Sequence, residues 1–230
     1  MDSRHPPLAV KVWGPLACFT RPEMKVERVT YEVMTPSAAR GVLEAIFWKP
    51  EFCWQVRTIE VLAPIRRQSI QRNEVKTKAA PQTVRKWADG EDKGFFADDD
   101  RTQRHTLALR DVAYVIHADI VLQAHAAGES EAKYRDQFRR RVARGQCFQR
   151  PYLGCREFAA EFGEPDGEEQ PIDRSEDLGR MLLDLRYDAA GGRTVPVFFA
   201  ARLDRGVLTV PAAAYAALGQ GGDDAAAPTV

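Results

Sequence analysis

The sequence predicts an α+β protein, with an N-terminal domain of ferredoxin-like, or RRM-like, fold followed by a small domain formed by an antiparallel β-sheet. Three observations lead to this prediction. A strand, a helix and a second strand follow one another between residues 9 and 65, and another strand, helix and strand lie between residues 112 and 162. Strand-like runs broken by glycines then continue to residue 210. The order β-α-β-β-α-β is that of a ferredoxin-like fold.

The first helix is expected between Thr35 and Pro50. Thr35 suits the N-cap position, and Pro36 suits the first helical position, because the N–H that proline lacks would have no partner there. Pro50 ends the helix by disfavouring helical geometry in the residue before it. The apolar residues recur at helical spacing and make one stripe, formed by Ala39, Val42, Leu43, Ile46 and Phe47.

Residues 66–110 lack a clear period and predict a long, mobile β-hairpin or loop that projects from the sheet. A connection of this length in a compact domain is normally functional or disordered. Up to residue 86 it is strongly basic, so a nucleic-acid-binding finger and a solvated charged loop both fit. The candidate RNA ligands in this hairpin are Arg66, Arg67, Arg72 and Lys76.

The clearest strand is Val112–Gln123, where apolar residues alternate with others. The next helix is expected at residues 129–144, with Tyr134, Phe138 and Val142 buried at four-residue steps. Because its arginines lie mostly off this stripe, the helix should present a basic surface. Its candidate RNA ligands are Arg135, Arg139, Arg140 and Arg144.

The loop at residues 144–156 combines glycines, cations and aromatic rings. Glycine lets a backbone approach a ligand closely, arginine binds phosphate oxygens, and aromatic rings stack on bases. We therefore expect Phe148, Arg150 and Arg156 to contact nucleic acid. Clustered cations gain affinity by releasing counterions, so two basic segments in a neutral protein favour RNA or DNA as the partner.

Residues 164–177 are strongly acidic and predict a linker or an exposed turn. We therefore place the ferredoxin-like domain at residues 1–163 and the C-terminal β-sheet domain at residues 164–218. The strands of the second domain are expected at residues 178–187 and 195–210. The remaining residues, 219–230, are rich in glycine, aspartate and alanine, and we expect them to be disordered.

The bulk composition excludes several classes of protein. The chain has 230 residues, with 33 Lys+Arg and 33 Asp+Glu, so its formal net charge is zero. Four cysteines without a CxxC pair match neither a zinc finger nor a disulfide framework, and reduced thiols in a cytoplasmic protein are the simplest interpretation. The sequence contains no signal peptide and no apolar run long enough to cross a membrane. We expect no metal site and no cofactor.

His117 is the candidate for proton transfer, because histidine titrates near neutral pH. Asp119, two residues further along the same strand, points the same way and could bias the imidazole tautomer. RNA can be cut without metal by its own 2′-hydroxyl when a base, an acid and a cation lie near the phosphate. Lys49 could supply that cation. A purely structural His117 is the alternative.

Four blocks of the sequence resemble the CRISPR-associated Cas-five family in its type I-C form. They are WGPLACFTRPEMKVERVTYEVMTPSAARGVLEAIFWKP, Gln71 to Val75, QCFQRPYLGCREF and LGRMLLDL, and they occur in the family's order between Val10 and Val210. The resemblance implies a RAMP-type ferredoxin-like domain with a glycine-rich loop after its second helix, followed by a C-terminal β-sheet domain.

The resemblance also implies an activity. Such proteins bind the repeat hairpin of CRISPR precursor RNA and cut it at the hairpin base without metal, leaving a 2′,3′-cyclic phosphate. They then stay on the 5′ handle of the crRNA in the Cascade surveillance complex, beside its backbone and large subunits. The implied partners are therefore repeat RNA and these subunits, with no membrane.

The chain departs from the family at two catalytic positions. The family has a tyrosine just before Trp-Lys-Pro, where this chain has Phe47, and a basic pair in the strand of His117, where this chain has Asp119 at the next position on the same face.

The resemblance thus assigns catalysis to His117 with Lys49 and with Tyr31 or Lys25. The alternative is a subunit that holds the crRNA handle and cuts nothing. A general double-stranded nucleic-acid binder that cleaves DNA with metal is a weaker hypothesis.

Overall fold

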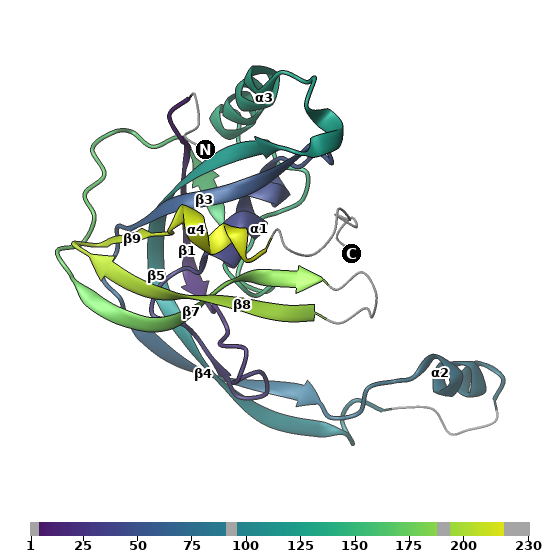
Figure 1. Cartoon of the computed structure of the whole chain (residues 1–230). Coiled ribbons are helices and arrows are strands. Elements are labelled where there is room, and N and C mark those ends of the chain that lie inside the picture. The colour runs from purple at the N-terminus through teal and green to yellow at the C-terminus, as the bar shows by residue number, and fades with distance from the viewer. Residues whose placement is uncertain (1–4, 91–95, 188–193, 219–230) are drawn as a thin grey trace.

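The computed structural model describes residues 5–90, 96–187 and 194–218, and its described strands form one curled sheet (Figure 1). The sheet order is β6-β1-β5-β3-β9-β8-β7, and β2 and β4 pair with the first half of β5. The strands are β1 (Leu8–Ala17), β2 (Arg28–Val29), β3 (Phe52–Val61), β4 (Arg67–Val75), β5 (Arg101–Leu122), β6 (Glu161–Gly163), β7 (Glu176–Tyr187), β8 (Thr194–Asp204) and β9 (Val207–Thr209). The helices are α1 (Pro36–Ile46), α2 (Pro81–Ala88), α3 (Glu131–Ala143) and α4 (Ala212–Ala216), with a 3₁₀ turn at Ala124–Ala126.

The predicted ferredoxin-like order is confirmed. β1, α1, β3, β5, α3 and β6 follow one another along the chain, and their strands lie in the order β6-β1-β5-β3 with antiparallel pairing throughout. The apolar residues of β1, β3 and β5 alternate with polar ones and enter one core with α1 and α3. This alternation is what a sheet with one buried face requires.

The start of α1 follows the predicted signals, but the helix ends at Ile46, earlier than the end expected before Pro50. The Thr35 hydroxyl accepts a hydrogen bond from the Ala38 N–H at 3.2 Å, and Pro36 occupies the first turn. Phe47 is the C-cap, and its buried ring lies 5.5 Å from the Phe52 ring. Trp54 of β3 packs on Phe138 of α3 at 4.8 Å between ring centroids, so both helices are fixed to the sheet by aromatic contacts.

The segment expected as a long hairpin or loop, residues 66–110, is a β-hairpin formed by its two ends. β4 pairs in antiparallel register with the first half of β5, from Arg67 opposite Leu109 to Val75 opposite Arg101. Figure 1 shows this hairpin extending away from the body of the molecule, with α2 near its tip. No residue of α2 is buried, which explains why hydrophobic periodicity did not predict this helix.

The C-terminal strands are antiparallel, as predicted, and they continue the N-terminal sheet. β9 pairs with β3, with Leu208 opposite Ile59. The Tyr215 hydroxyl donates to the Val56 carbonyl oxygen and accepts from the Val56 N–H, both at 3.0 Å. Residues of both expected domains therefore share one hydrophobic core.

Two expectations fall on residues outside the described ranges. They are the disordered tail at residues 219–230 and the break at Gly191-Gly192 between the last long strands. In the described part of the chain, no helix is long and apolar enough to span a membrane.

Candidate functional site

The outer face of α3 is basic, as its sequence predicts. Tyr134, Phe138 and Val142 are buried against the sheet. Arg139 and Arg140 are exposed, and together with Lys133 and Asp136 they line a shallow hollow on the surface. Arg139 forms an ion pair with Asp136, with 3.2 Å between Nη1 and Oδ1. Arg140 forms none with the described residues. This face therefore offers cations to an anionic partner.

Two other arginines of α3 serve the fold. Arg135 is only 2% exposed, and its guanidinium donates hydrogen bonds to the Pro6 carbonyl and to Glu131. The sequence placed Arg135 among the RNA ligands, but its burial leaves no surface for a ligand. Arg141 donates to the Ile46 carbonyl oxygen at 2.8 Å and lies 5.3 Å from the Phe47 ring, so it links α3 to the end of α1.

The glycine-rich loop begins where α3 ends, in a Schellman motif. The Gln146 N–H donates to the Arg141 carbonyl at 2.8 Å, the Gly145 N–H donates to Val142 at 3.1 Å, and Gly145 has a φ of +61°. The Phe148 N–H then donates to the Ala45 carbonyl of α1 at 2.8 Å. The Phe148 side chain is nonetheless 81% exposed, so a fixed backbone presents a free aromatic ring.

The second half of this loop packs on β1. Cys18 donates its N–H to the Leu153 carbonyl at 3.0 Å, and Gly154 has a φ of +86°. A Cβ at Gly154 would lie 2.2 Å from the Cys18 carbonyl oxygen, so only glycine fits. Arg144 and Arg156 are exposed, whereas Arg150 is paired with Glu161.

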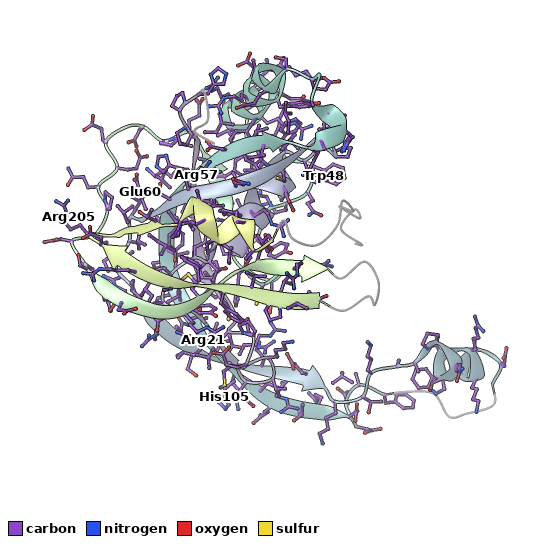
Figure 2. All side chains as sticks on the ribbon, in the orientation of Figure 1. Arg21, Trp48, Arg57, Glu60, His105 and Arg205 are labelled. Atoms are coloured by element: carbon purple, nitrogen blue, oxygen red, sulfur yellow. The ribbon has the colours of Figure 1, made fainter. Side chains whose placement is uncertain are left out.

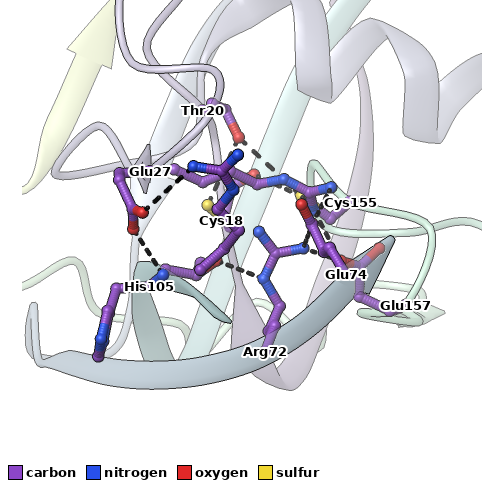
Figure 3. Close-up of polar contacts among 11 residues, drawn as sticks. Cys18, Thr20, Glu27, Arg72, Glu74, His105, Cys155 and Glu157 are labelled. Carbon is purple, nitrogen blue, oxygen red and sulfur yellow. Dashed lines mark hydrogen bonds and ion pairs between the residues drawn. The ribbon is translucent and has the colours of Figure 1, made fainter. Parts of the chain in front are cut away.

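A network of charged groups ties β4 of the hairpin to the end of this loop (Figure 3). Arg72 Nε donates to the Thr106 hydroxyl at 2.7 Å, and its Nη1 lies 2.5 Å from Glu74. Arg28 reaches Glu157 at 2.7 Å and Glu74 at 3.7 Å. Arg72 is thus largely neutralised by carboxylates.

The other three cations of the hairpin differ in their pairing. Arg67 pairs with Glu32 at 2.9 Å. Arg66 and Lys76 are exposed, and within the described residues neither forms an ion pair. These two side chains are the hairpin cations most available to a phosphate.

His117 lies on the face of β5 opposite the core residues Ile116 and Ala118, where it meets a carboxylate from β3. Its Nε2 is 2.9 Å from Oε1 of Glu60, and the two side chains are 28% and 25% exposed. Asp119, expected beside the imidazole, instead pairs with Arg57, with Nε at 2.6 Å from Oδ2. The other oxygen of Asp119 is buried and has no hydrogen-bond partner among the described residues.

The structure does not gather the other two catalytic candidates around His117. Tyr31 is 1% exposed, and burial raises its pKa. The N–H of its neighbour Thr30 donates a hydrogen bond to the Leu107 carbonyl at 3.0 Å, and Leu107 lies ten residues before His117 on β5. Lys49 is exposed three residues before Phe52, which pairs with Leu122, about 17 Å along β5 from the level of His117.

Arg57 and Glu60 were missed by the sequence analysis, although a signal for them exists. Strict alternation, counted back from the apolar residues Val61 and Ile59, would turn Arg57 toward the core and Glu60 away from it. A charged residue at a core position therefore indicates an irregular strand. Among the described residues, no group of three or more His, Cys, Asp or Glu side chains is arranged to hold a metal ion.

Comparison with known proteins gives a family. A family model described as CRISPR-associated protein (Cas_Cas5) matches residues 8–211. A curated relative from Thermus thermophilus, named CRISPR pre-crRNA endoribonuclease Cas5d, is 47% identical over 224 residues, which cover 90% of this chain and 93% of that protein. A relative of the same name from Mannheimia succiniciproducens is 45% identical over 216 residues, covering 89% of this chain and 94% of that protein.

Solved structures agree on the fold. One described as a CRISPR-associated protein has a TM-score of 0.65 at 22% identity, over 92% of this chain and 95% of that chain. The functionally uncharacterized protein SMU1763c from Streptococcus mutans has a TM-score of 0.62 at 17% identity, over 88% and 91% of the two chains. The matching family model and the two full-length relatives establish that this chain belongs to the Cas5d family of CRISPR-associated proteins.

Proposed function

We propose that this chain is a CRISPR pre-crRNA endoribonuclease, which binds the repeat hairpin and cuts the precursor at the hairpin base without metal. The observation that carries the proposal is the sequence identity of 47% and 45% to two proteins of that name, over about nine-tenths of this chain and of each relative. A likeness of this extent covers every element of the sheet and both helices that pack on it.

The RNA-binding surface consists of exposed cations and one exposed ring. We assign contacts with phosphates to the exposed cations of the hairpin, of α3 and of the glycine-rich loop, and a stacking contact to Phe148. The proposed phosphate ligands are Arg66, Lys76, Arg139, Arg140, Arg144 and Arg156. Arg67, Arg72 and Arg150 would have to exchange a protein carboxylate for phosphate, so they come second.

Cleavage uses the RNA's own 2′-hydroxyl. Its oxygen attacks the adjacent phosphorus, the bond to the 5′ oxygen breaks, and the products are a 2′,3′-cyclic phosphate and a 5′-hydroxyl. The proton of the 2′-hydroxyl passes to a base, and the 5′ oxygen takes a proton from water. We assign the role of base to His117, whose imidazole is partly exposed on the sheet and can accept a proton through a ring nitrogen.

After cleavage the protein stays on the 5′ handle of the crRNA, as a subunit of Cascade beside the backbone and large subunits. We also propose a cytoplasmic location, which suits the four unpaired cysteines.

A second function is favoured by one residue. Phe47 has no hydroxyl, and its ring is buried beneath the Arg141 guanidinium, so this position moves no proton. The chain would then hold the crRNA handle without cutting.

One experiment separates the two functions. The purified protein is incubated with labelled repeat RNA in EDTA, beside an RNA with a 2′-deoxy substitution at the cut site. We expect a single cut in the first RNA and none in the second. His117→Ala should lower the cleavage rate about 100-fold or more while RNA affinity stays within two-fold. Tight binding without a cut would favour the handle-holding function, and a cut in the deoxy RNA would exclude attack by the 2′-hydroxyl.

A further inference from the structure

We propose that β3 supplies two further functional residues to the site of His117. Glu60 is a positioning residue for the imidazole, and Arg57 is a catalytic residue that binds the scissile phosphate. This inference rests on the proposed endoribonuclease function and names groups that perform it. Figure 2 marks Arg57 and Glu60 on β3.

A β-bulge in β3 places these residues. The register of β3 against β5 shifts between Val56, opposite Ala118, and Thr58, opposite His117, so Arg57 is an extra residue in the strand. Val56 and Ile59 on either side remain in the core. Arg57 and Thr58 must therefore both leave the core face. Bulges occur often beside active sites, where they re-aim a side chain.

The bulge also brings Glu60 to His117. Glu60 is opposite Val115, two residues from His117 on the same face of β5, so the two side chains meet diagonally across the strands. An ionised carboxylate accepts hydrogen bonds only, so the 2.9 Å contact requires the hydrogen of neutral His117 on Nε2. The lone pair of Nδ1 is then the acceptor for the 2′-hydroxyl proton. Glu60 in this way fixes the tautomer that acts as base, and it stabilises the imidazolium once the proton arrives.

Arg57 is oriented by a buried partner. Its Nε donates to Asp119, whose side chain is only 4% exposed. The two terminal NH₂ groups of Arg57 have no hydrogen-bond partner among the described residues, and the side chain is 24% exposed. A guanidinium held at Nε with both terminal groups free presents the fork that binds phosphate oxygens.

The distribution of burial argues against a purely structural pair of salt bridges. Asp119 is buried and anchors Arg57, whereas the groups that would meet RNA, on Arg57, Glu60 and His117, each keep about a quarter of their surface exposed. Lys49, the cation that the sequence suggested, lies in the connection after α1, at the level of the end of β5. Arg57 is adjacent in sequence to Thr58, which pairs directly with His117.

The test compares rate with affinity in the full-length protein, under single-turnover conditions with saturating protein and labelled repeat RNA in EDTA. Glu60→Ala should lower the cleavage rate about 10- to 100-fold while RNA affinity stays within two-fold. Glu60→Gln keeps a carbonyl oxygen that accepts from Nε2, so it should recover part of the lost rate. The matched control is Glu44→Ala, because Glu44 has a similar exposure of 22% and pairs with Arg40 on α1. That variant should cleave like the wild type.

Arg57 is tested in the same assay. Arg57→Ala should lower the rate about 10- to 100-fold, and Arg57→Lys, which keeps the charge but not the fork, should recover only part of it.

The outcomes distinguish the two levels of the proposal. If the wild type binds the RNA but does not cut it, the proposed function fails and takes this inference with it. If the wild type cuts and the Glu60 and Arg57 variants cut equally fast, only this inference is overturned. The inference is also overturned if weaker RNA binding or a lower melting temperature explains the whole loss of rate, and if Glu60→Gln and Arg57→Lys recover none of it. These residues would then serve only the fold.

Discussion

Cys155 has the most strongly lowered thiol pKa among the described residues. Its sulfur lies 3.4 Å from Nη1 of Arg28 and 4.0 Å from the Thr20 hydroxyl, in the network that joins the hairpin to the glycine-rich loop (Figure 3). A hydrogen bond from the Cys18 thiol is the main cause that lowers the pKa of Cys155 to about 6, and Arg28 adds to it. The same pairing, together with burial, raises the pKa of Cys18.

This asymmetry predicts selective alkylation. At pH 7, above its pKa, Cys155 is mainly thiolate, the form that reacts, and it is half-buried, whereas Cys18 is fully buried. Iodoacetamide should therefore modify Cys155 before Cys18, at a rate that rises through pH 6 and levels off above pH 7. Cys18→Ala removes the donor and should move this midpoint to higher pH. Peptide mass spectrometry over a pH series gives the rates, and a rate that still climbs at pH 9 would contradict the assignment.

At the scale of elements, the glycine-rich loop allows a matched pair of substitutions. Gly145 and Gly154 both have positive φ, but a Cβ at Gly145 meets nothing within 4 Å, whereas a Cβ at Gly154 meets the Cys18 carbonyl at 2.2 Å. Gly145→Ala should cost about 1–2 kcal/mol of stability, from the left-handed backbone alone. Gly154→Ala should cost clearly more, because β1 and the loop must separate.

Thermal unfolding of both variants checks this difference. In a chain of this length each kcal/mol lowers the melting temperature by roughly 2–4 °C. Equal melting temperatures for the two variants would show that the loop does not pack on β1 as described.

Some features of the helices and strands could be predicted from the sequence, and others could not. Alternation predicted the second half of β5, from Val112 on, and the capping signals predicted the start of α1, because burial and backbone geometry leave a local mark. Helix α2 was missed although it has Pro81 in its first turn and Arg85 and Lys86 in its last, and none of its residues is buried. The polar residues Arg57 and Glu60 indicate an irregular β3, but its register against β5 and its pairing with β9 could not be predicted, because each depends on segments distant in the chain. The pairing of His117 with Glu60 depends on the same register.

At the scale of the whole molecule, the sheet unites segments that composition separates. The acidic stretch at residues 164–177 suggested a boundary, yet part of it is bound to the sheet. Lys11 of β1 lies 3.0 Å from Glu169, and the Ile172 N–H donates to the Val61 carbonyl at 2.9 Å. The pKa of Glu169 is lowered to about 2, to which its hydrogen bonds with the backbone and with Lys11 contribute against desolvation. The acids of this stretch thus partly serve the fold.

A net charge of zero combined with a basic α3 face makes RNA affinity depend on where charge lies rather than on its total. Each phosphate contact that releases a counterion steepens the dependence of log K on log salt by about 0.7 to 0.9. Arg139→Ala combined with Arg140→Ala should therefore weaken binding to repeat RNA and flatten this slope by about one to two. Arg180→Ala with Arg202→Ala removes the same charge from exposed positions on β7 and β8 and should leave the slope unchanged. Filter binding at several salt concentrations measures both, and equal slopes for the two double variants would show that the α3 face does not contact RNA.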